Sequence, residues 1–80
     1  MNLNYLDNEI EVYDINNTII KVGHRVVFVS GTKMSKGTVQ YLEILTAWIK
    51  EDGREQYNNT SAWNDAVFVL TKSQFPEEYL

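Results

Sequence analysis

Short segments with the composition of β-strands, separated by turn signals, are the feature that most restricts the fold of this chain. Residues 25–30 and 66–70 are rich in β-branched and aromatic side chains, as expected of buried strands. Residues 38–44 alternate polar and apolar side chains for most of their length, which is typical of a strand with one buried face. Turn signals recur about every eight to twelve residues, without a convincing long helical pattern. The sequence therefore predicts an all-β domain.

The N-terminal half contains two further strand segments. Residues 9–14 begin with polar and apolar alternation, and residues 18–22 lead into Gly23, with Asn16-Asn17 as the turn between them. After the strand at residues 25–30, we expect a loop from Gly31 to Gly37 that contains Thr32, Lys33, Met34, Ser35 and Lys36.

A hairpin is predicted in the C-terminal half. Residues 45–50 fit a strand better than a helical turn, although Leu42, Leu45 and Ile49 also have helical spacing. Asp52-Gly53 suits a tight type I′ turn, so residues 48–51 should pair with residues 54–57. We then expect a loop at residues 58–61, one short turn at residues 62–65, and a C-terminal segment, residues 75–80, whose aromatic side chains dock on the domain.

Length restricts the architecture to one domain. Eighty residues provide for one core, so we assign residues 1–80 to a single unit. Five or six short strands fit a small SH3-like barrel better than an immunoglobulin sandwich, which needs about 100 residues. Closing the sheet would also remove exposed strand edges.

The spacing of two glycines resembles the pattern of a known protein family. Residues 20–26, Ile-Lys-Val-Gly-His-Arg-Val, followed by Gly37-Thr38-Val39, resemble the V-G-D-x-V and G-x-V pattern of small SH3-like proteins, including KOW-type modules and uncharacterised bacteriophage proteins. The similarity covers about residues 12–45, and His24 stands where the pattern usually has an acidic residue. The resemblance implies an SH3-like barrel and a phage or bacterial setting, and it carries over no catalytic residue.

Composition argues against several kinds of chemistry. The chain has one histidine and no cysteine, so we expect no metal site built from those residues, no cysteine nucleophile and no disulfide. It has no Gly-x-Ser-x-Gly motif or phosphate-binding glycine loop, so we expect neither an enzyme nor a cofactor. Without a signal peptide pattern or an apolar run long enough for a membrane span, we expect a cytoplasmic protein without a membrane partner.

Charge is distributed unevenly along the chain. The formal net charge is −4, but residues 15–42 contain four cations and no carboxylate. Those cations form a basic segment at residues 21–36, and they are Lys21, Arg25, Lys33 and Lys36. They could contact phosphate, although a dedicated DNA-binding domain is usually far more basic. His24 is either a polar turn residue or a pH-sensitive contact.

Aromatic residues around the predicted hairpin suggest a binding face. Trp48, Tyr57 and Trp63 lie in or beside polar sequence, and Arg54 lies among them. Exposed Trp, Tyr and Arg dominate binding hot spots, whereas a thin core would instead bury the tryptophans. We therefore expect a small protein-binding module, a phage-encoded modulator of a host protein that acts by occupancy.

Two other functions stay open, as does a homodimer through edge strands. The first is a KOW-like nucleic-acid contact through the basic segment, with Tyr41 or Trp48 stacked on a base. The second is a pocket between protomers for a small ligand such as a signalling nucleotide. Salt dependence would support the first alternative, and thermal stabilisation by a ligand would support the second.

Overall fold

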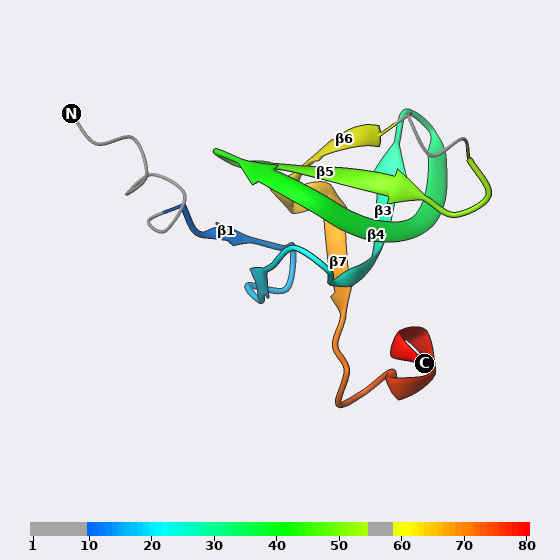
Figure 1. Cartoon of the computed structure of the whole chain (residues 1–80). Coiled ribbons are helices and arrows are strands. Elements are labelled where there is room, and N and C mark those ends of the chain that lie inside the picture. The colour runs from blue at the N-terminus through cyan, green and yellow to red at the C-terminus, as the bar shows by residue number, and fades with distance from the viewer. Residues whose placement is uncertain (1–9, 55–58) are drawn as a thin grey trace.

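The computed structural model describes residues 10–54 and 59–80, and their elements are β-strands and short 3-10 helices. Strands β3 to β7 form one antiparallel sheet in the order β6-β5-β4-β3-β7, while β1 and β2 form a separate antiparallel pair (Figure 1). The elements are β1 Val12–Tyr13, β2 Ile19–Ile20, β3 Arg25–Ser30, β4 Lys33–Glu43, β5 Thr46–Glu51, β6 Asn59–Trp63, η1 Asn64–Ala66, β7 Val67–Leu70 and η2 Pro76–Tyr79.

The all-β prediction is confirmed, but the described strands do not close into a barrel. Hydrogen-bonded pairing ends at β6 on one side of the larger sheet and at β7 on the other. The long strand β4 bends strongly as it crosses the domain, and the sheet curves around its buried face (Figure 1). Within the described residues, no helix has the length and hydrophobicity of a transmembrane span.

One core joins both sheets. Alternate side chains of the larger sheet point into its concave face, because successive residues of a strand face opposite sides. Burial of each large apolar side chain contributes about 1.5–3 kcal/mol. The buried cluster consists of Val12, Ile20, Val26, Phe28, Val39, Ala47, Ile49, Ala62, Val67 and Val69.

The predicted loop from Gly31 to Gly37 is wrong, because the connection between β3 and β4 is only two residues long. Ser30 pairs with Lys33, leaving Gly31 and Thr32 as the turn, and Gly31 has a φ of 65°. The polar side chains of Lys33, Ser35 and Lys36 obscured the strand in the sequence. They face solvent or lie at the sheet surface, where a strand tolerates them.

Gly37 lies within β4, where two strands approach closely. It pairs with Val26 of β3 and with Glu51 of β5. A β-carbon at this position would overlap the backbone carbonyl oxygen of Lys50 and lie 2.7 Å from Cγ2 of Ile49. The sequence analysis placed Gly37 at a loop end, whereas its role is this close backbone approach.

A second hairpin turn, between β4 and β5, was missed. Glu43 pairs with Thr46, so Ile44 and Leu45 form a two-residue turn, and Leu45 has a φ of 59°. Positive φ is unusual for leucine, and no glycine or asparagine marks this turn. The Leu45 carbonyl oxygen accepts a hydrogen bond from the Asn64 N–H at 2.9 Å, which ties the turn to η1. The strand predicted at residues 45–50 is confirmed for residues 46–50, and Leu45 belongs to the turn.

The predicted partner of β5 is also wrong. Trp48 pairs with Ser61 and Lys50 pairs with Asn59, so residues 59–61 are strand and not loop. Asp52-Gly53 does form a turn, with Gly53 at a φ of 83°, but Arg54 belongs to no strand. The other residues of the predicted pairing, 55–57, lie outside the described residues, as do Glu9 and Asn58.

The remaining predicted elements are close to the observed ones. The strands predicted at residues 9–14 and 18–22 shorten to β1 and β2, and the turn at Asn16-Asn17 is confirmed by a φ of 62° at Asn17. The short turn predicted at residues 62–65 is wrong for Ala62 and Trp63, which belong to β6, while residues 64–66 form η1; the last strand is β7.

C-terminal docking is confirmed by Tyr79. Its hydroxyl donates to the Leu70 carbonyl oxygen at 2.6 Å and accepts from the Arg25 N–H at 2.9 Å.

The buried carboxylate of Asp14 covers the β7 edge of the sheet. Asp14 is only 5% exposed to solvent. Oδ1 accepts hydrogen bonds from the N–H groups of Asn16 and Thr18 at 2.9 and 2.7 Å, and Oδ2 accepts one from the N–H of Val69 at 2.8 Å. The N–H of Ile15 donates to the Val67 carbonyl oxygen at 2.9 Å. The turn between β1 and β2 therefore occupies the outward backbone groups of β7.

Replacing Gly37 with alanine should lower the free energy of unfolding by about 1–3 kcal/mol, because the added methyl group forces β4 and β5 apart. Urea denaturation measures this change. Gly53→Asn is the control, since Gly53 faces open space and asparagine tolerates positive φ. Equal stability of Gly37→Ala and the wild type would contradict the close approach.

Asp14→Asn should lower the free energy of unfolding by about 2–4 kcal/mol, because an amide has one acceptor oxygen for three converging N–H donors. Thermal and urea unfolding measure the loss. Asp65→Asn, at an exposed position, should change stability by less than about 0.5 kcal/mol. An Asp14→Asn protein as stable as the Asp65→Asn control would show that the carboxylate is dispensable.

Candidate functional site

A bulge in β4 places an aromatic residue on the outer face of the sheet. The pairing register between β4 and β5 shifts between Val39 and Tyr41. Val39 is buried, whereas Tyr41 is exposed and lies opposite Trp48 of β5. In a regular strand Tyr41, two residues after buried Val39, would also face the core, and the bulge at Gln40 turns it outward instead.

Tyr41 and Trp48 form a rigid stacked pair on this outer face. Their ring centroids are 5.5 Å apart, and the ring planes differ by 14°. Nε1 of Trp48 donates a hydrogen bond of 2.6 Å to Oε1 of Glu43. Stacking and this charge-assisted bond hold the indole in one orientation, so a partner would lose little side-chain entropy by contacting it.

Trp63 extends the same surface onto β6. It pairs with Thr46, and Trp48 pairs with Ser61, so the two tryptophans occupy diagonal positions on one face of neighbouring strands. Trp63 is 67% exposed. We call Tyr41, Trp48 and Trp63 the aromatic face. The exposed turn residues Ile44 and Leu45 lie at the end of the same hairpin.

The structure brings together part of the predicted protein-binding set. Trp48 and Trp63 share the aromatic face, whereas Arg54 lies beyond the end of β5 and its Nη1 is 3.7 Å from Oε1 of Glu51. Tyr57 lies outside the described residues. Tyr41 was not in that set, since only the nucleic-acid alternative named it, and no sequence signal marks the bulge that exposes it.

The basic segment does not form a free cationic surface. Nη2 of Arg25 is 2.5 Å from Oδ2 of Asp52, and its Nε is 3.2 Å from Oε1 of Glu78. Nζ of Lys36 is 2.9 Å from Oε2 of Glu78. Two of the four predicted phosphate-binding cations are therefore paired with carboxylates from distant segments. The sequence could not show this, because the partners come from residues far outside the basic segment.

The other residues of the segment separate from each other. Lys21 precedes the turn at Gly23, and Lys33 starts β4 beyond the β3–β4 turn. Nδ1 of His24 accepts a hydrogen bond from the N–H of Lys21 at 3.1 Å. Partial burial, followed by the nearby Lys21 charge, lowers the pKa of His24 below its ordinary 6.5. These contacts support the turn role of His24, with a neutral imidazole at pH 7.

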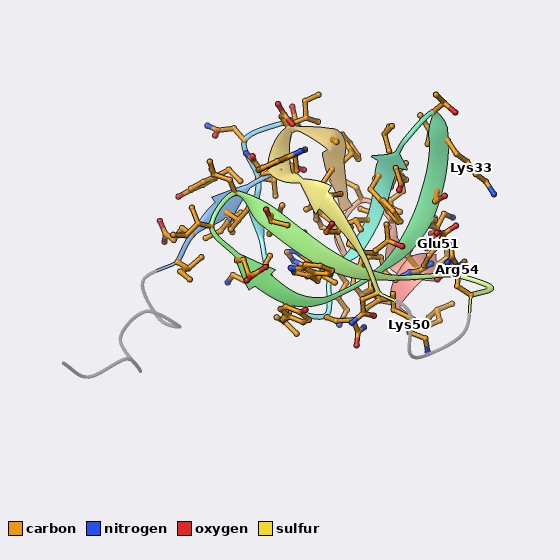
Figure 2. All side chains as sticks on the ribbon, turned by 90° about the horizontal axis from the view of Figure 1, so that it is seen from above. Lys33, Lys50, Glu51 and Arg54 are labelled. Atoms are coloured by element: carbon orange, nitrogen blue, oxygen red, sulfur yellow. The ribbon has the colours of Figure 1, made fainter. Side chains whose placement is uncertain are left out.

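Cations do gather at one end of the sheet, where β5 ends and β6 begins. Figure 2 labels Lys50, Glu51 and Arg54 there, and shows Lys33 apart from them at the start of β4. We call this region, with Arg25, Lys36, Asp52 and Glu78, the basic end. Among the described residues named here, four cations stand against three carboxylates, which leaves a surplus of one positive charge.

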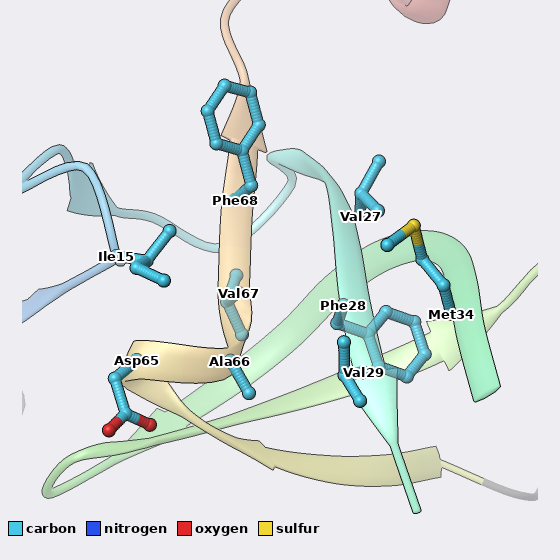
Figure 3. A pocket seen from close by; sticks show the side chains of 9 residues that line it. All are labelled: Ile15, Val27, Phe28, Val29, Met34, Asp65, Ala66, Val67 and Phe68. Carbon is cyan, nitrogen blue, oxygen red and sulfur yellow. The ribbon is translucent and has the colours of Figure 1, made fainter. Parts of the chain in front are cut away.

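An apolar cleft of about 170 Å³ lies between β3, β4 and β7 (Figure 3). Val29, Met34 and Phe68 line it and are exposed, and Ile15 closes one side. Asp65 is the one charged residue among the described residues that line it. The sequence analysis did not single out this surface, because its residues come from four separate segments.

No protein-family model, curated protein or solved structure matches this chain.

Arg25 should control the titration of Asp52. The hydrogen bonds from the Arg25 guanidinium, followed by its charge, lower the pKa of Asp52 below its ordinary 3.8, with smaller contributions from Lys36 and Lys50. The folded protein thus holds this carboxylate ionised, and the associated stability is present above pH 3.8 and lost as the pH falls through the lower folded pKa. Arg25→Met should raise the Asp52 pKa, as measured by NMR titration of its carboxyl carbon.

Arg54→Met is the matched control, since Arg54 pairs with Glu51 and not with Asp52. An Asp52 pKa that is the same in Arg25→Met and Arg54→Met would contradict the ion pair.

Proposed function

We propose that this chain is a small non-enzymatic protein-binding module and that the aromatic face is its binding surface. The main support for this proposal is the exposure of Trp63 beside the stacked Tyr41 and Trp48 rings. Tryptophan and tyrosine are the side chains most enriched in binding hot spots, and they offer large contact areas at low entropic cost. Such a module acts by occupying its target.

The partner class follows from the resemblance to SH3-like phage proteins. We propose a host protein as target and an SH3-like relationship for the fold. The relationship is supported by the strongly bent antiparallel sheet around a single core, while closure of the barrel is not observed in the described strands. A cytoplasmic location belongs to the same proposal.

Nucleic-acid binding is the weaker candidate on charge. Arg25 and Lys36 already pair with Asp52 and Glu78, so phosphate would have to compete with two bound carboxylates. The stacked Tyr41 and Trp48 rings could still accept a base, because aromatic stacking is tolerant of sequence. A nucleotide site between protomers remains the third candidate, with ligand-dependent thermal stabilisation as its test.

Trp63→Ala should reduce capture of a target protein from bacterial lysate by at least about tenfold, because hot-spot aromatics contribute about 2 kcal/mol or more to binding. Tagged protein is used at low and high salt, with and without nuclease, and bound protein is quantified. Unfolding should be unchanged within about 0.5 kcal/mol, since Trp63 contributes little to the core.

Met34→Ala is the matched control, because Met34 is equally exposed but lines the apolar cleft. Loss of capture with Met34→Ala alone would move the binding surface to the cleft. Capture that disappears with nuclease or high salt, and with Lys33→Ala combined with Lys36→Ala, would favour nucleic acid.

A further inference from the structure

The two edges of the larger sheet differ in how their backbone groups are used. At β7, the carbonyl oxygen of Val67 and the N–H of Val69 are bonded to Ile15 and to the Asp14 carboxylate. At β6, within the part of the chain that the structure describes, the outward N–H groups of Ser61 and Trp63 and the outward C=O of Ser61 form no hydrogen bond.

The orientation of these β6 groups follows from the ladder between β5 and β6. The N–H of Asn64 donates to the carbonyl oxygen of Leu45, so Leu45 and Asn64 form a hydrogen-bonded pair, and the backbone groups of Asn64 point toward the β5 side. Hydrogen-bonded and non-hydrogen-bonded pairs alternate in an antiparallel ladder. The groups of Ala62 therefore face β5, and those of Ser61 and Trp63 face away from it.

Within residues 10–54 and 59–80, strand β6 has none of the usual features that block an exposed edge. Natural edge strands are commonly blocked by a lysine, a proline, a bulge or a covering loop. The sequence of β6 is Asn-Thr-Ser-Ala-Trp, its pairing with β5 is continuous, and it contains no charge or proline. The residues with outward backbone groups, Ser61 and Trp63, also carry their side chains on the exposed side.

The geometry points to β6 as a docking edge for an extended segment of a partner protein, which adds an antiparallel strand beside Ser61 and Trp63. This inference rests on the proposed function and names the partner chemistry of the same surface. An added strand takes its affinity from main-chain hydrogen bonds and its specificity from alternate side chains. Those side chains would lie next to Trp63 on the aromatic face.

Charge at the basic end indicates which side chains the second half of the partner segment should carry. An antiparallel strand runs from the Trp63 end of β6 toward Asn59, which pairs with Lys50. Its later residues thus approach Lys50 and the surplus positive charge of the basic end (Figure 2). The fitting segment has apolar residues at alternate positions followed by acidic residues at alternate positions.

A designed peptide tests this inference. The probe is the acetylated and amidated peptide TVTITETE, which presents Val, Ile, Glu and Glu on one face, and its control is TVTITKTK. We expect the acidic peptide to bind about five- to tenfold more tightly than the basic one, because each Glu-to-Lys exchange replaces an attraction to the basic end with a repulsion. NMR titration measures both affinities on the full chain.

Ser61→Pro removes the outward N–H that the added strand requires, at an edge position where proline is tolerated in a sheet. Ser61→Ala is the matched control that keeps the N–H. We expect about tenfold weaker peptide binding by Ser61→Pro and less than twofold change by Ser61→Ala. Amide exchange of Ser61 and Trp63 in the wild type should also slow when peptide binds, which tests pairing even if Ser61→Pro does not fold.

Several outcomes overturn the inference. Equal binding by Ser61→Pro and Ser61→Ala excludes edge pairing, as does unchanged amide exchange in the complex. Wild-type dimerisation that Ser61→Pro abolishes, measured by sedimentation, assigns the edge to a second copy of this chain instead. Lysate capture that depends on Trp63 but is unaffected by Ser61→Pro keeps the proposed function and rejects only the edge.

Discussion

The close approach of β4 and β5 at Gly37 is the constraint on which the rest of the structure depends. β4 is the longest strand and pairs with both β3 and β5, so its backbone lies at the centre of the sheet. Only a residue without a β-carbon fits against the Lys50 carbonyl there. The approach brings buried Val26 and Ile49 to the same side, where they join the core.

The bulge further along β4 turns a side chain away from the core. One extra residue, Gln40, reverses which side chains point outward, so Val39 belongs to the core while Tyr41 stacks on Trp48 outside it. The same strand thus places Val39 in the core before the bulge and Tyr41 on the candidate binding surface after it, while Leu42 packs against the core. Bulges are common next to functional sites because they re-aim a side chain in this way.

The two edges of the sheet differ in how their backbone groups are satisfied. Covering β7 with the Asp14 carboxylate protects one edge by satisfying its backbone donors within the chain. The β6 edge lies beside Trp63 and near the surplus charge of the basic end. Edge, aromatic face and charge are therefore adjacent on one side of the domain, although they derive from separate parts of the sequence.

Local pattern alone determined the all-β class, the bounds of β3, most of β5 and β7, and the turns at Asn17 and Gly53, because alternation and turn propensity act over a few residues. Tertiary structure alone decided the partner of β5, the leucine-containing turn at Leu45, the bulge before Tyr41 and the neutralisation of Arg25 and Lys36. Trp48 and Trp63 could be chosen from the sequence as candidate binding residues, but their shared face could not. Strand register and ion pairing join residues far apart in the chain, and neither leaves a local signal.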